Sequence, residues 1–475
     1  MIRFFNTLTR KKEKFVPLEK GIVKMYNCGL TVYDYAHIGN LRAFTVADLL
    51  RRYLEYRGFQ VEQVMNFTDV GHMVADVDIG EDKLEASAKK EKKDPWVIAD
   101  FYIKAFLQDA PRMNFEPPMV RPRATEHIEV MIEMIKKLVK KGYAYVVNGS
   151  VYFDVTKFEG YGKLSGNTVE KLKTGAGGRI EFNPDKKNQF DFALWISDPK
   201  HMMNWKSPWS EKGYPGWHIE CSAMAVKYLG ETIDIHTGGV DNIFPHHENE
   251  IAQSEAATGK KFANYWLHVE YLLVDGGKMS KSLGNFYTLE DLIAKGYDPK
   301  SVRYILMATH YRQQLDFTFE GLKAAEKAVE RLTLFNQRLT ETNGKPMGEE
   351  LEKLLKTTRK DFEAAMNDDL NITKALAALF DFVRDVNKMI DQGKVSRREA
   401  RAVHDLMMRL DRVLAILGET EKELLPREIE ELIQKREEAR KAKDWKTADA
   451  IRKELSDMGI ILEDTTTGVK WRRKS

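Results

Sequence analysis

Two cysteines, one histidine and one glutamate could together hold a metal ion. The 475-residue chain has only two cysteines, Cys28 and Cys221. His246 and Glu250 are four positions apart, so on a helix their side chains would share a face. Zinc accepts thiolate, imidazole and carboxylate ligands. These four side chains are therefore candidate zinc ligands, provided that the fold brings them together.

The same residues also allow a purely structural interpretation. Cysteine often packs as a small buried hydrophobe, and Cys28 and Cys221 lack the Cys-x-x-Cys spacing of many zinc sites. His247 and Glu248 also carry ligand side chains, but a helix that presents His246 would direct them elsewhere. The pattern by itself leaves both interpretations open.

A loop rich in lysine and serine could bind the phosphates of a nucleotide. Residues 278–282, Lys-Met-Ser-Lys-Ser, follow an expected strand at residues 271–274 and a glycine turn. Lys278 and Lys281 could place positive charge where a pyrophosphate leaving group develops negative charge. The alternative is an ordinary basic surface loop.

Residues 37–40, His-Ile-Gly-Asn, fall where a loop turns into an expected helix. Free backbone N–H groups and the positive end of the helix dipole favour an anion there. Gly39 would let a phosphate or base approach the backbone, and His37 could donate to developing charge. A loop histidine followed by a turn glycine is the structural alternative.

A second glycine turn could bind a ribose. Residues 233–236 are expected to form a strand, and Gly238, Gly239 and Asp241 follow it. Glycines in this setting admit a ribose, and a carboxylate can accept hydrogen bonds from its hydroxyls. A plain β-turn fits the same residues.

The elements that would position these side chains form an α/β pattern. Residues 21–27 predict a strand, residues 42–57 a helix that ends at Gly58, and residues 60–66 a second strand. Strand, helix and strand in that order indicate a βαβ unit with a parallel sheet. The α/β pattern returns near Trp217, so the segment between predicts an insertion that splits one domain.

The insertion and the C-terminal part differ in character from the first 70 residues. A hairpin is expected at residues 143–153, followed by a loop-rich stretch at 155–190. After about residue 320 the periodicity is nearly all helical, ending with helices at about 427–442 and 445–457. Asp444 is placed to cap the last helix and Gly459 to end it.

Composition narrows the class of protein. The chain is 43% hydrophobic and 31% charged, without the apolar run of about 18 residues that a membrane span needs. With no signal-like N-terminus, we expect a cytoplasmic protein without a disulfide framework. A net charge of +3 does not indicate nucleic-acid binding by a global field. Residues 470–474 are a local basic candidate, or simply a solvated tail.

Taken in order along the chain, these motifs resemble the class I aminoacyl-tRNA synthetases, and more closely the cysteine–tRNA ligases. The resemblance spans essentially the whole chain, from residues 5–9 to residues 470–473. It rests on His-Ile-Gly-Asn at 37–40, Lys-Met-Ser-Lys-Ser at 278–282, and the stretches at 26–34, 216–222 and 244–250.

The resemblance implies a two-step reaction in which ATP and L-cysteine give cysteinyl-adenylate and pyrophosphate, and the cysteinyl group then passes to the 3′ end of tRNA(Cys). It implies one zinc ion per chain, open to the substrate thiolate, with Mg²⁺ expected to accompany ATP. The implied catalytic residues are His37, Asn40, Lys278 and Lys281. The implied ATP contacts are His37, Gly39, Asn40, Gly238, Gly239, Asp241 and Lys281. The implied amino-acid contacts are Gly29, Thr68 and Trp217, and the implied zinc ligands are Cys28, Cys221, His246 and Glu250.

Two segments depart from the family pattern. Asn40 stands where the class signature ends in histidine, so it can donate to a phosphate but carries no positive charge. Residues 68–73, Thr-Asp-Val-Gly-His-Met, replace a Thr-Asp-x-Asp-Asp-Lys form, although Thr68 is retained. The role of the missing acidic pair is therefore open.

The expected fold is a Rossmann-like parallel-sheet catalytic domain split by an insertion and followed by an all-α C-terminal region. We expect a monomer, with Trp471, Arg472 and Arg473 contacting tRNA. The alternatives are a cysteine ligase that acts on an amino sugar and a non-catalytic tRNA-binding paralogue. The expected domains are 1–70 with 205–275 (catalytic), 71–204 (insertion), 276–320 (Lys-Met-Ser-Lys-Ser loop and stem contact), 321–418 (helical bundle) and 419–475 (anticodon recognition).

Overall fold

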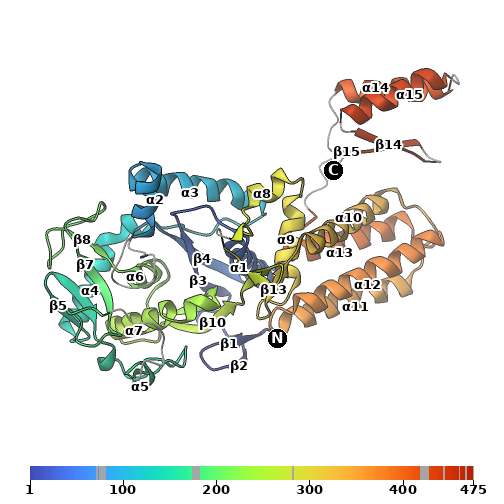
Figure 1. The fold of residues 1–475 in the computed structure, drawn as a ribbon. Helices are drawn as coiled ribbons and strands as arrows, with labels where there is room; N and C mark the ends of the chain where they lie inside the picture. Colours follow the sequence, from blue (N-terminus) through green and yellow to red (C-terminus); the bar gives the residue numbers. More distant parts are fainter. Residues whose placement is uncertain are drawn as a thin grey trace. The chain divides into compact units, whose positions relative to one another are not determined.

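In the computed structural model, a four-stranded parallel sheet takes its strands from two separate parts of the sequence (Figure 1). Its strands, in the spatial order β10-β9-β3-β4, are β10 (Ala263–Val269), β9 (Ile233–Gly239), β3 (Ile22–Thr31) and β4 (Gln60–Thr68). Helix α1 (Ile38–Tyr56) joins β3 to β4, and α7 (His246–Thr258) joins β9 to β10. The strands are largely buried, as parallel strands with covered faces must be. The Rossmann-like sheet expected from the sequence is confirmed.

The structure describes residues 1–475 except 71, 72, 74–81, 174–181, 281, 282, 418–426, 442, 443, 459, 466, 467, 474 and 475. The predicted phosphate contact Lys281 and the predicted helix terminator Gly459 lie outside the described residues. The chain divides into two compact units, residues 1–416 and residues 417–475.

Three strands of the sheet bring candidate site residues to one edge. Cys28 and Gly29 lie near the end of β3, Thr68 ends β4, and Gly239 ends β9. The strands are parallel; the β3–β4 register shifts between Asn27 and Leu30, where Cys28 and Gly29 lie, and Thr31 pairs with Thr68 beyond that shift. Because the carboxyl ends of parallel strands meet at the same edge, ligands commonly bind there.

The residues between β4 and β9 form helices and a separate antiparallel sheet. The helices are α2 (Lys83–Glu91), α3 (Pro95–Arg112), η1 (Ala124–His127), α4 (Ile128–Lys140), η2 (Val155–Lys157), α5 (Val169–Lys173) and α6 (Trp217–Leu229). The sheet has the order β5-β6-β7-β8, with β5 (Ala144–Val147), β6 (Ser150–Phe153), β7 (Phe192–Ser197) and β8 (Gly213–Pro215). Strands β5 and β6 form the predicted hairpin, with Asn148 and Gly149 at positive φ in its turn.

Short elements precede and follow the strands of the parallel sheet in the sequence, and one lies between β9 and α7. They are β1 (Arg3–Asn6), β2 (Lys11–Lys14), η3 (Val240–Ile243), β11 (Leu272–Val274), β12 (Gly277–Lys278), α8 (Leu289–Ala294), α9 (Pro299–Ala308) and β13 (Leu315–Phe317). Strand β11 pairs with both β12 and β13, so the glycine turn before Lys278 is held in a three-stranded sheet.

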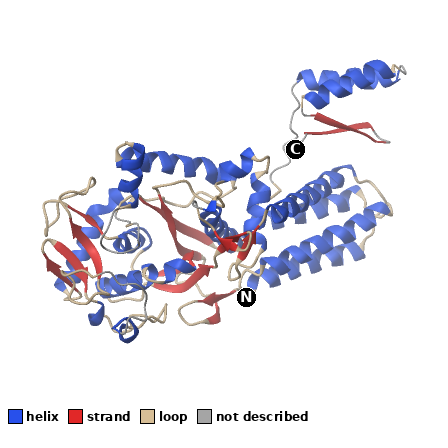
Figure 2. Ribbon diagram, in the orientation of Figure 1, coloured by secondary structure: helices blue, strands red, loops and turns tan. Residues whose placement is uncertain are grey.

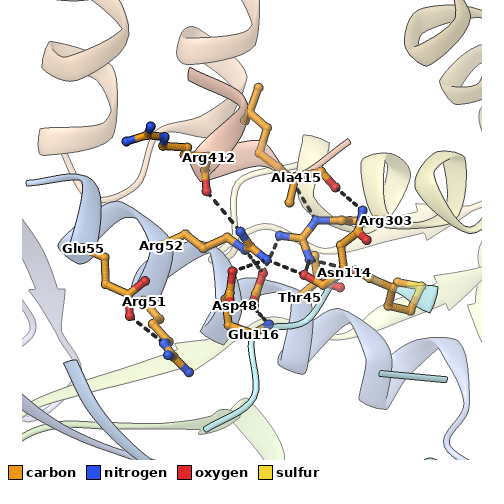
Figure 3. A network of polar contacts seen from close by, with 12 residues as sticks. Thr45, Asp48, Arg51, Arg52, Glu55, Asn114, Glu116, Arg303, Arg412 and Ala415 are labelled. Atoms are coloured by element: carbon orange, nitrogen blue, oxygen red, sulfur yellow. Dashed lines mark hydrogen bonds and ion pairs between the residues drawn. The ribbon is translucent and has the colours of Figure 1, made fainter. Parts of the chain in front are cut away.

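Four long helices complete the first unit, as the periodicity after residue 320 predicts (Figure 2). They are α10 (Phe319–Glu341), α11 (Glu349–Asn367), α12 (Ile372–Asp391) and α13 (Arg397–Leu414). Arg303 of α9 connects these helices to α1 (Figure 3). Its guanidinium forms a buried ion pair with Asp48 of α1 at 2.5 Å, and its Nε donates to the carbonyl of Leu414 in α13. None of the helices in the described ranges combines the length and apolarity that crossing a bilayer requires.

The second unit contains the two predicted helices and a hairpin that the sequence analysis did not predict. Helices α14 (Arg427–Lys441) and α15 (Trp445–Asp457) match the expected ranges, and Asp444 caps α15 by accepting from Thr447 N. Strands β14 (Ile460–Thr465) and β15 (Gly468–Arg473) pair antiparallel. The helical expectation therefore needs this addition, because β14 starts with a run of three apolar residues and does not alternate as an amphipathic strand would.

Candidate active site and metal centre

The four candidate zinc ligands converge at the carboxyl edge of the parallel sheet. One ligand atom from each of Cys28, Cys221, His246 and Glu250 lies within 4.8 Å of the others. Cys28 comes from β3, Cys221 from α6, and the other two from the first turns of α7. His246 Nε2 and Cys28 Sγ lie 3.1 and 3.8 Å from the same oxygen, Oε1 of Glu250. The arrangement has the donor types and the proximity that a zinc site requires.

A second set of ligand atoms shares two members with the first. Cys28, His236, His247 and Glu250 also lie within 4.8 Å of one another. His247 Nε2 is 3.1 Å from Cys28 Sγ, so the expectation that α7 directs His247 elsewhere is wrong. The helix begins at His246, so His246 and His247 both lie in its first turn. From these adjacent positions, both imidazole rings come close to Cys28 of β3.

Glu248, in contrast, does point away from the site, as expected. Its Oε2 accepts hydrogen bonds from the backbone N–H and the hydroxyl of Ser165, both at 2.8 Å. Tyr161 donates to the neighbouring Asn249, so this side of α7 faces the inserted segment. The helix therefore directs Glu248 and Glu250 to different sides, with Glu250 facing the sheet edge.

Buried histidines surround the first ligand set and orient it. His236 Nε2 lies 2.9 Å from Oε2 of Glu250, which leaves Oε1 facing the two cysteines and His246. His247 Nδ1 lies 2.8 Å from His268 Nε2. Such outer partners fix the rotamers of metal ligands. Because soft thiolates suit zinc, the set with two cysteines is the better zinc site.

Burial and neighbouring charges set the pKa values of these side chains. The hydrogen bond with Cys28 lowers the pKa of Cys221 to about 6, against the effect of burial. Burial raises the pKa of the Cys28 thiol, and the neighbouring Cys221 adds to this effect. Burial would raise the pKa of Glu250, but the charges of His236 and His246 outweigh it and lower the pKa to about 2. An ionised carboxylate and a thiolate in a buried site favour a bound cation.

The expected amino-acid contacts lie directly beside this cluster. The Trp217 ring stacks on His246, with centroids 4.3 Å apart and planes 26° apart. A Cβ on Gly29 would overlap the backbone oxygen of Asn66, so only glycine fits there. Thr68 is buried at the end of β4. Gly29, next to Cys28, and Trp217 thus adjoin the ligand set, and Thr68 ends the strand that pairs with β3.

Asn66 connects these residues, and the sequence analysis missed it. Its Oδ1 accepts from Gly29 N at 3.0 Å and lies 3.8 Å from Cys221 Sγ, while its Nδ2 donates to Thr68 Oγ1 at 3.1 Å. The side chain is only 1% exposed. The available signal was its spacing: residues 66 and 68 of one strand point to the same face. His236 was missed because an isolated histidine in a strand has no pattern of its own.

The His-Ile-Gly-Asn turn starts α1 through its own side chains. His37 Nδ1 accepts from the backbone N–H groups of Gly39 and Asn40, at 3.1 and 3.2 Å. Asn40 Oδ1 accepts in return from His37 N at 3.2 Å, which completes a capping box. The helix therefore begins at Ile38, four residues earlier than predicted, and two of the N–H groups expected to be free are capped. Because Nδ1 accepts these bonds, a neutral His37 ring carries its proton on Nε2.

Met279 of the lysine-rich loop and two residues that follow the loop pack against this turn. Ile38 N donates to Tyr287 O at 2.9 Å, and the Phe286 ring contacts the His37 ring edge-on at 5.1 Å. Met279 Cε lies 3.3 Å from the position that a Cβ of Gly39 would take. The two signature segments, about 240 residues apart in sequence, are thus neighbours in the fold. Lys278 ends β12 beside them.

The second glycine turn lies at the end of β9, at the same sheet edge. Gly238 packs against the His247 ring, and a Cβ at Gly239 would overlap the Asp241 carboxylate. Asp241 lies in η3, directly after the strand. The expected ribose contacts therefore adjoin the metal cluster.

Trp471, Arg472 and Arg473 lie on β15 of the second unit, and their role in tRNA binding stays a prediction.

Three family models match successive parts of the chain. The model described as tRNA synthetases class I (C) catalytic domain matches residues 14–327. The DALR domain model matches residues 361–418, and the Cysteinyl-tRNA ligase anticodon binding domain matches residues 422–472.

Curated relatives match over the full length. The cysteine–tRNA ligase of Clostridioides difficile (strain 630) is 48% identical over 479 residues, covering 99% of this chain and all of the relative. The cysteine–tRNA ligase of Solibacter usitatus (strain Ellin6076) is 45% identical over 477 residues, covering all of both chains.

Among solved structures, the Mycobacterium tuberculosis methionyl-tRNA synthetase in complex with methionyl-adenylate shares the fold. Its TM-score is 0.60 at 15% identity, and the match covers 83% of this chain and 90% of that one. The chain therefore belongs to the cysteine–tRNA ligase family, with a class I tRNA synthetase catalytic domain.

Proposed function

We propose that this chain uses ATP to activate L-cysteine as cysteinyl-adenylate and then transfers the cysteinyl group to the 3′ end of tRNA(Cys). The observation that carries the proposal is the convergence of two thiols, an imidazole and a carboxylate next to Trp217 and the glycine turns at one sheet edge. In a member of this ligase family, thiol ligands beside the amino-acid pocket indicate that the substrate is itself a thiol.

The selecting group is proposed to be one zinc ion held by Cys28, Cys221, His246 and Glu250. The donor set fits zinc in type and in number, and the ionised Glu250 and Cys221 supply the negative charge that a cation requires. A zinc ion bound there would supply a Lewis acid that binds a thiolate far better than a neutral hydroxyl. His236 would hold the carboxylate through its second oxygen.

The chain's own residues would position ATP for attack by the cysteine carboxylate on the α-phosphorus, which releases pyrophosphate. His37 Nε2 and the amide nitrogen of Asn40 are the proposed donors to phosphate oxygens, since their other polar atoms form the helix cap. Lys278 and Lys281 would neutralise the pyrophosphate. Gly238, Gly239 and Asp241 would receive the ribose, and Mg²⁺ is expected to accompany ATP.

Selection of cysteine by a metal would make editing, the hydrolysis of tRNA charged with a wrong amino acid, unnecessary. Serine differs from cysteine by one atom, and an apolar pocket discriminates such small differences by only about 10–200-fold. A direct bond between metal and thiolate distinguishes the two by chemistry instead of size. We therefore expect the protein not to hydrolyse seryl-tRNA, and rapid deacylation of seryl-tRNA by the purified protein would contradict this proposal.

The match of residues 422–472 to an anticodon-binding domain favours tRNA over an amino sugar as the acceptor. A non-catalytic paralogue is disfavoured because the four zinc ligands and both lysines are retained. We propose that Trp471 stacks on an anticodon base and that Arg472 and Arg473 contact phosphates. The monomeric state and the cytoplasmic location stay predictions, which sedimentation and cell fractionation test.

The deciding experiment combines ATP–pyrophosphate exchange with metal analysis. The parent protein should contain about one zinc per chain, catalyse exchange with cysteine but not with serine, and charge tRNA(Cys). Cys221→Ser should lose zinc and cysteine-dependent exchange together, whereas Ser222→Ala, at the next position of α6, should keep both. Exchange without bound zinc would refute the proposed selection mechanism.

A further inference from the structure

Three large apolar side chains form an exposed face beside the His37 turn. Tyr35 lies two residues before His37, and Val97 and Phe101 lie one turn apart on α3. Tyr35, Val97 and Phe101 are 41%, 54% and 45% exposed. Side chains of this kind are usually buried, and a contiguous exposed group of them marks a binding surface. We call these three residues the α3 platform.

The α3 platform is contiguous and held in place from below. The Tyr35 and Phe101 ring centroids are 5.8 Å apart, and residues 97 and 101 share a helix face. Both rings also pack on the buried Tyr102, at 5.1 Å each. Tyr102 is fixed by its hydroxyl, which donates to Glu91 at 3.0 Å. The exposed rings are therefore preorganised, which lowers the entropy cost of binding a ligand.

Positive charge surrounds the α3 platform. The exposed Lys93 ammonium lies 5.6 Å from the Phe101 ring centroid and 3.0 Å from the Glu91 carboxylate, and the exposed Lys104 lies one turn further along α3. The exposed lysines at positions 89, 90 and 92, at the end of α2, add to it. The nearest acid on α3, Asp100, is paired with Arg123 at 2.6 Å. Exposed rings flanked by lysines are the pattern that binds single-stranded nucleic acid.

We propose that the α3 platform stacks the unpaired bases of the tRNA 3′ end as this strand enters the active site. The proposal rests on the function proposed above, because transfer requires the 3′ ribose to reach the adenylate beside His37. Base stacking on Tyr35 and Phe101 would guide the strand, with Lys93 and Lys104 facing its phosphates. Stacking tolerates any base, so the platform would position the end without reading its sequence.

Kinetics of ring-keeping and ring-losing variants test the stacking. Phe101→Ala and Phe101→Leu should each lower kcat/KM for tRNA by about tenfold relative to the exchange rate, while Phe101→Trp keeps the parent value. Leu107→Ala is the matched control, since it removes an apolar side chain of α3 that is 41% exposed. Tyr35→Ala should reproduce the loss. Equal losses in charging and exchange, or a Phe101→Leu variant that matches the parent, would overturn the proposal.

A direct probe separates this inference from the proposed function. With 2-aminopurine in the unpaired 3′ end of the tRNA, binding to the parent should quench its fluorescence, and Phe101→Leu should abolish the quenching. Lys93→Gln should lower the salt slope of tRNA binding by about 0.7. Quenching that Phe101→Leu leaves unchanged would overturn the α3 platform as an RNA site. So would a parent protein that is a dimer, if Phe101→Leu dissociates this dimer without affecting charging. If the parent protein catalyses no cysteine-dependent ATP–pyrophosphate exchange, the proposed function itself is refuted.

Discussion

His236 tests how the surroundings of the metal site control its affinity. Its Nε2 lies 2.9 Å from Oε2 of Glu250, and its ring stacks on Trp266 with centroids 4.6 Å apart. His236→Phe keeps the stacked ring but removes the hydrogen bond. Among the described residues, the other ring nitrogen of His236 has no hydrogen-bond partner, so this bond is the one lost. A hydrogen bond to a charged group contributes about 1.5–3 kcal/mol.

That energy corresponds to an expected 10- to 100-fold loss of zinc affinity. The assay is competition for zinc with a chromophoric chelator, followed by unfolding measurements that check the fold. His127→Phe is the control, because His127 is likewise buried but lies outside the site. Both of its ring nitrogens form hydrogen bonds, so this control removes at least as many bonds as His236→Phe. If His236→Phe binds zinc as tightly as the parent, Glu250 is not a ligand that His236 orients.

Four further outcomes follow from the structure. Asn66→Leu should raise the KM for cysteine about tenfold with a smaller change in kcat, because a buried hydrogen-bonded network is lost; a change confined to kcat would argue against a pocket role. Asp48→Asn should destabilise the first unit by about 3–5 kcal/mol in urea unfolding by leaving Arg303 buried without its partner, and Asp48→Asn/Arg303→Met should recover part of this. Burial raises the pKa of Asp109 to about 6, above its unfolded value of about 3.9. The folded protein therefore loses stability as the pH rises from about 4 to 6, because the buried carboxyl must ionise. Asp109→Asn should therefore raise the melting temperature at pH 7 more than at pH 4, and an equal shift at both would refute the assignment. Truncation after Thr467 should weaken charging of tRNA and spare cysteine-dependent exchange, and equal loss of both would indicate a structural role.

Local patterns were enough to predict the first βαβ unit, the helical region after about residue 320 and the two helices between residues 427 and 457. The His246 and Glu250 pair was predictable because helical spacing alone puts both on one face. The approach of Cys28 and Cys221 was not, because it depends on how α6 packs beside β3. Only the resemblance to the ligase family indicated that they belong together.

The remaining differences have local physical causes. The His37 ring caps α1, which a search for the usual capping residues does not detect. His247 reaches Cys28 because α7 starts one residue before it, and a helix start is uncertain by a few residues in any sequence interpretation. The β14–β15 hairpin was missed because the apolar residues of β14 form a run instead of alternating with polar ones.

The central claim is that a metal in this site recognises the substrate by its thiol. The direct measurement is the absorption of the cobalt-substituted protein during titration with cysteine and with serine. The thiolate-to-cobalt charge-transfer band of Cys28 and Cys221 should grow when cysteine adds a third thiolate, and serine should leave it unchanged. An identical response to both amino acids, or none to cysteine, would contradict selection through the metal.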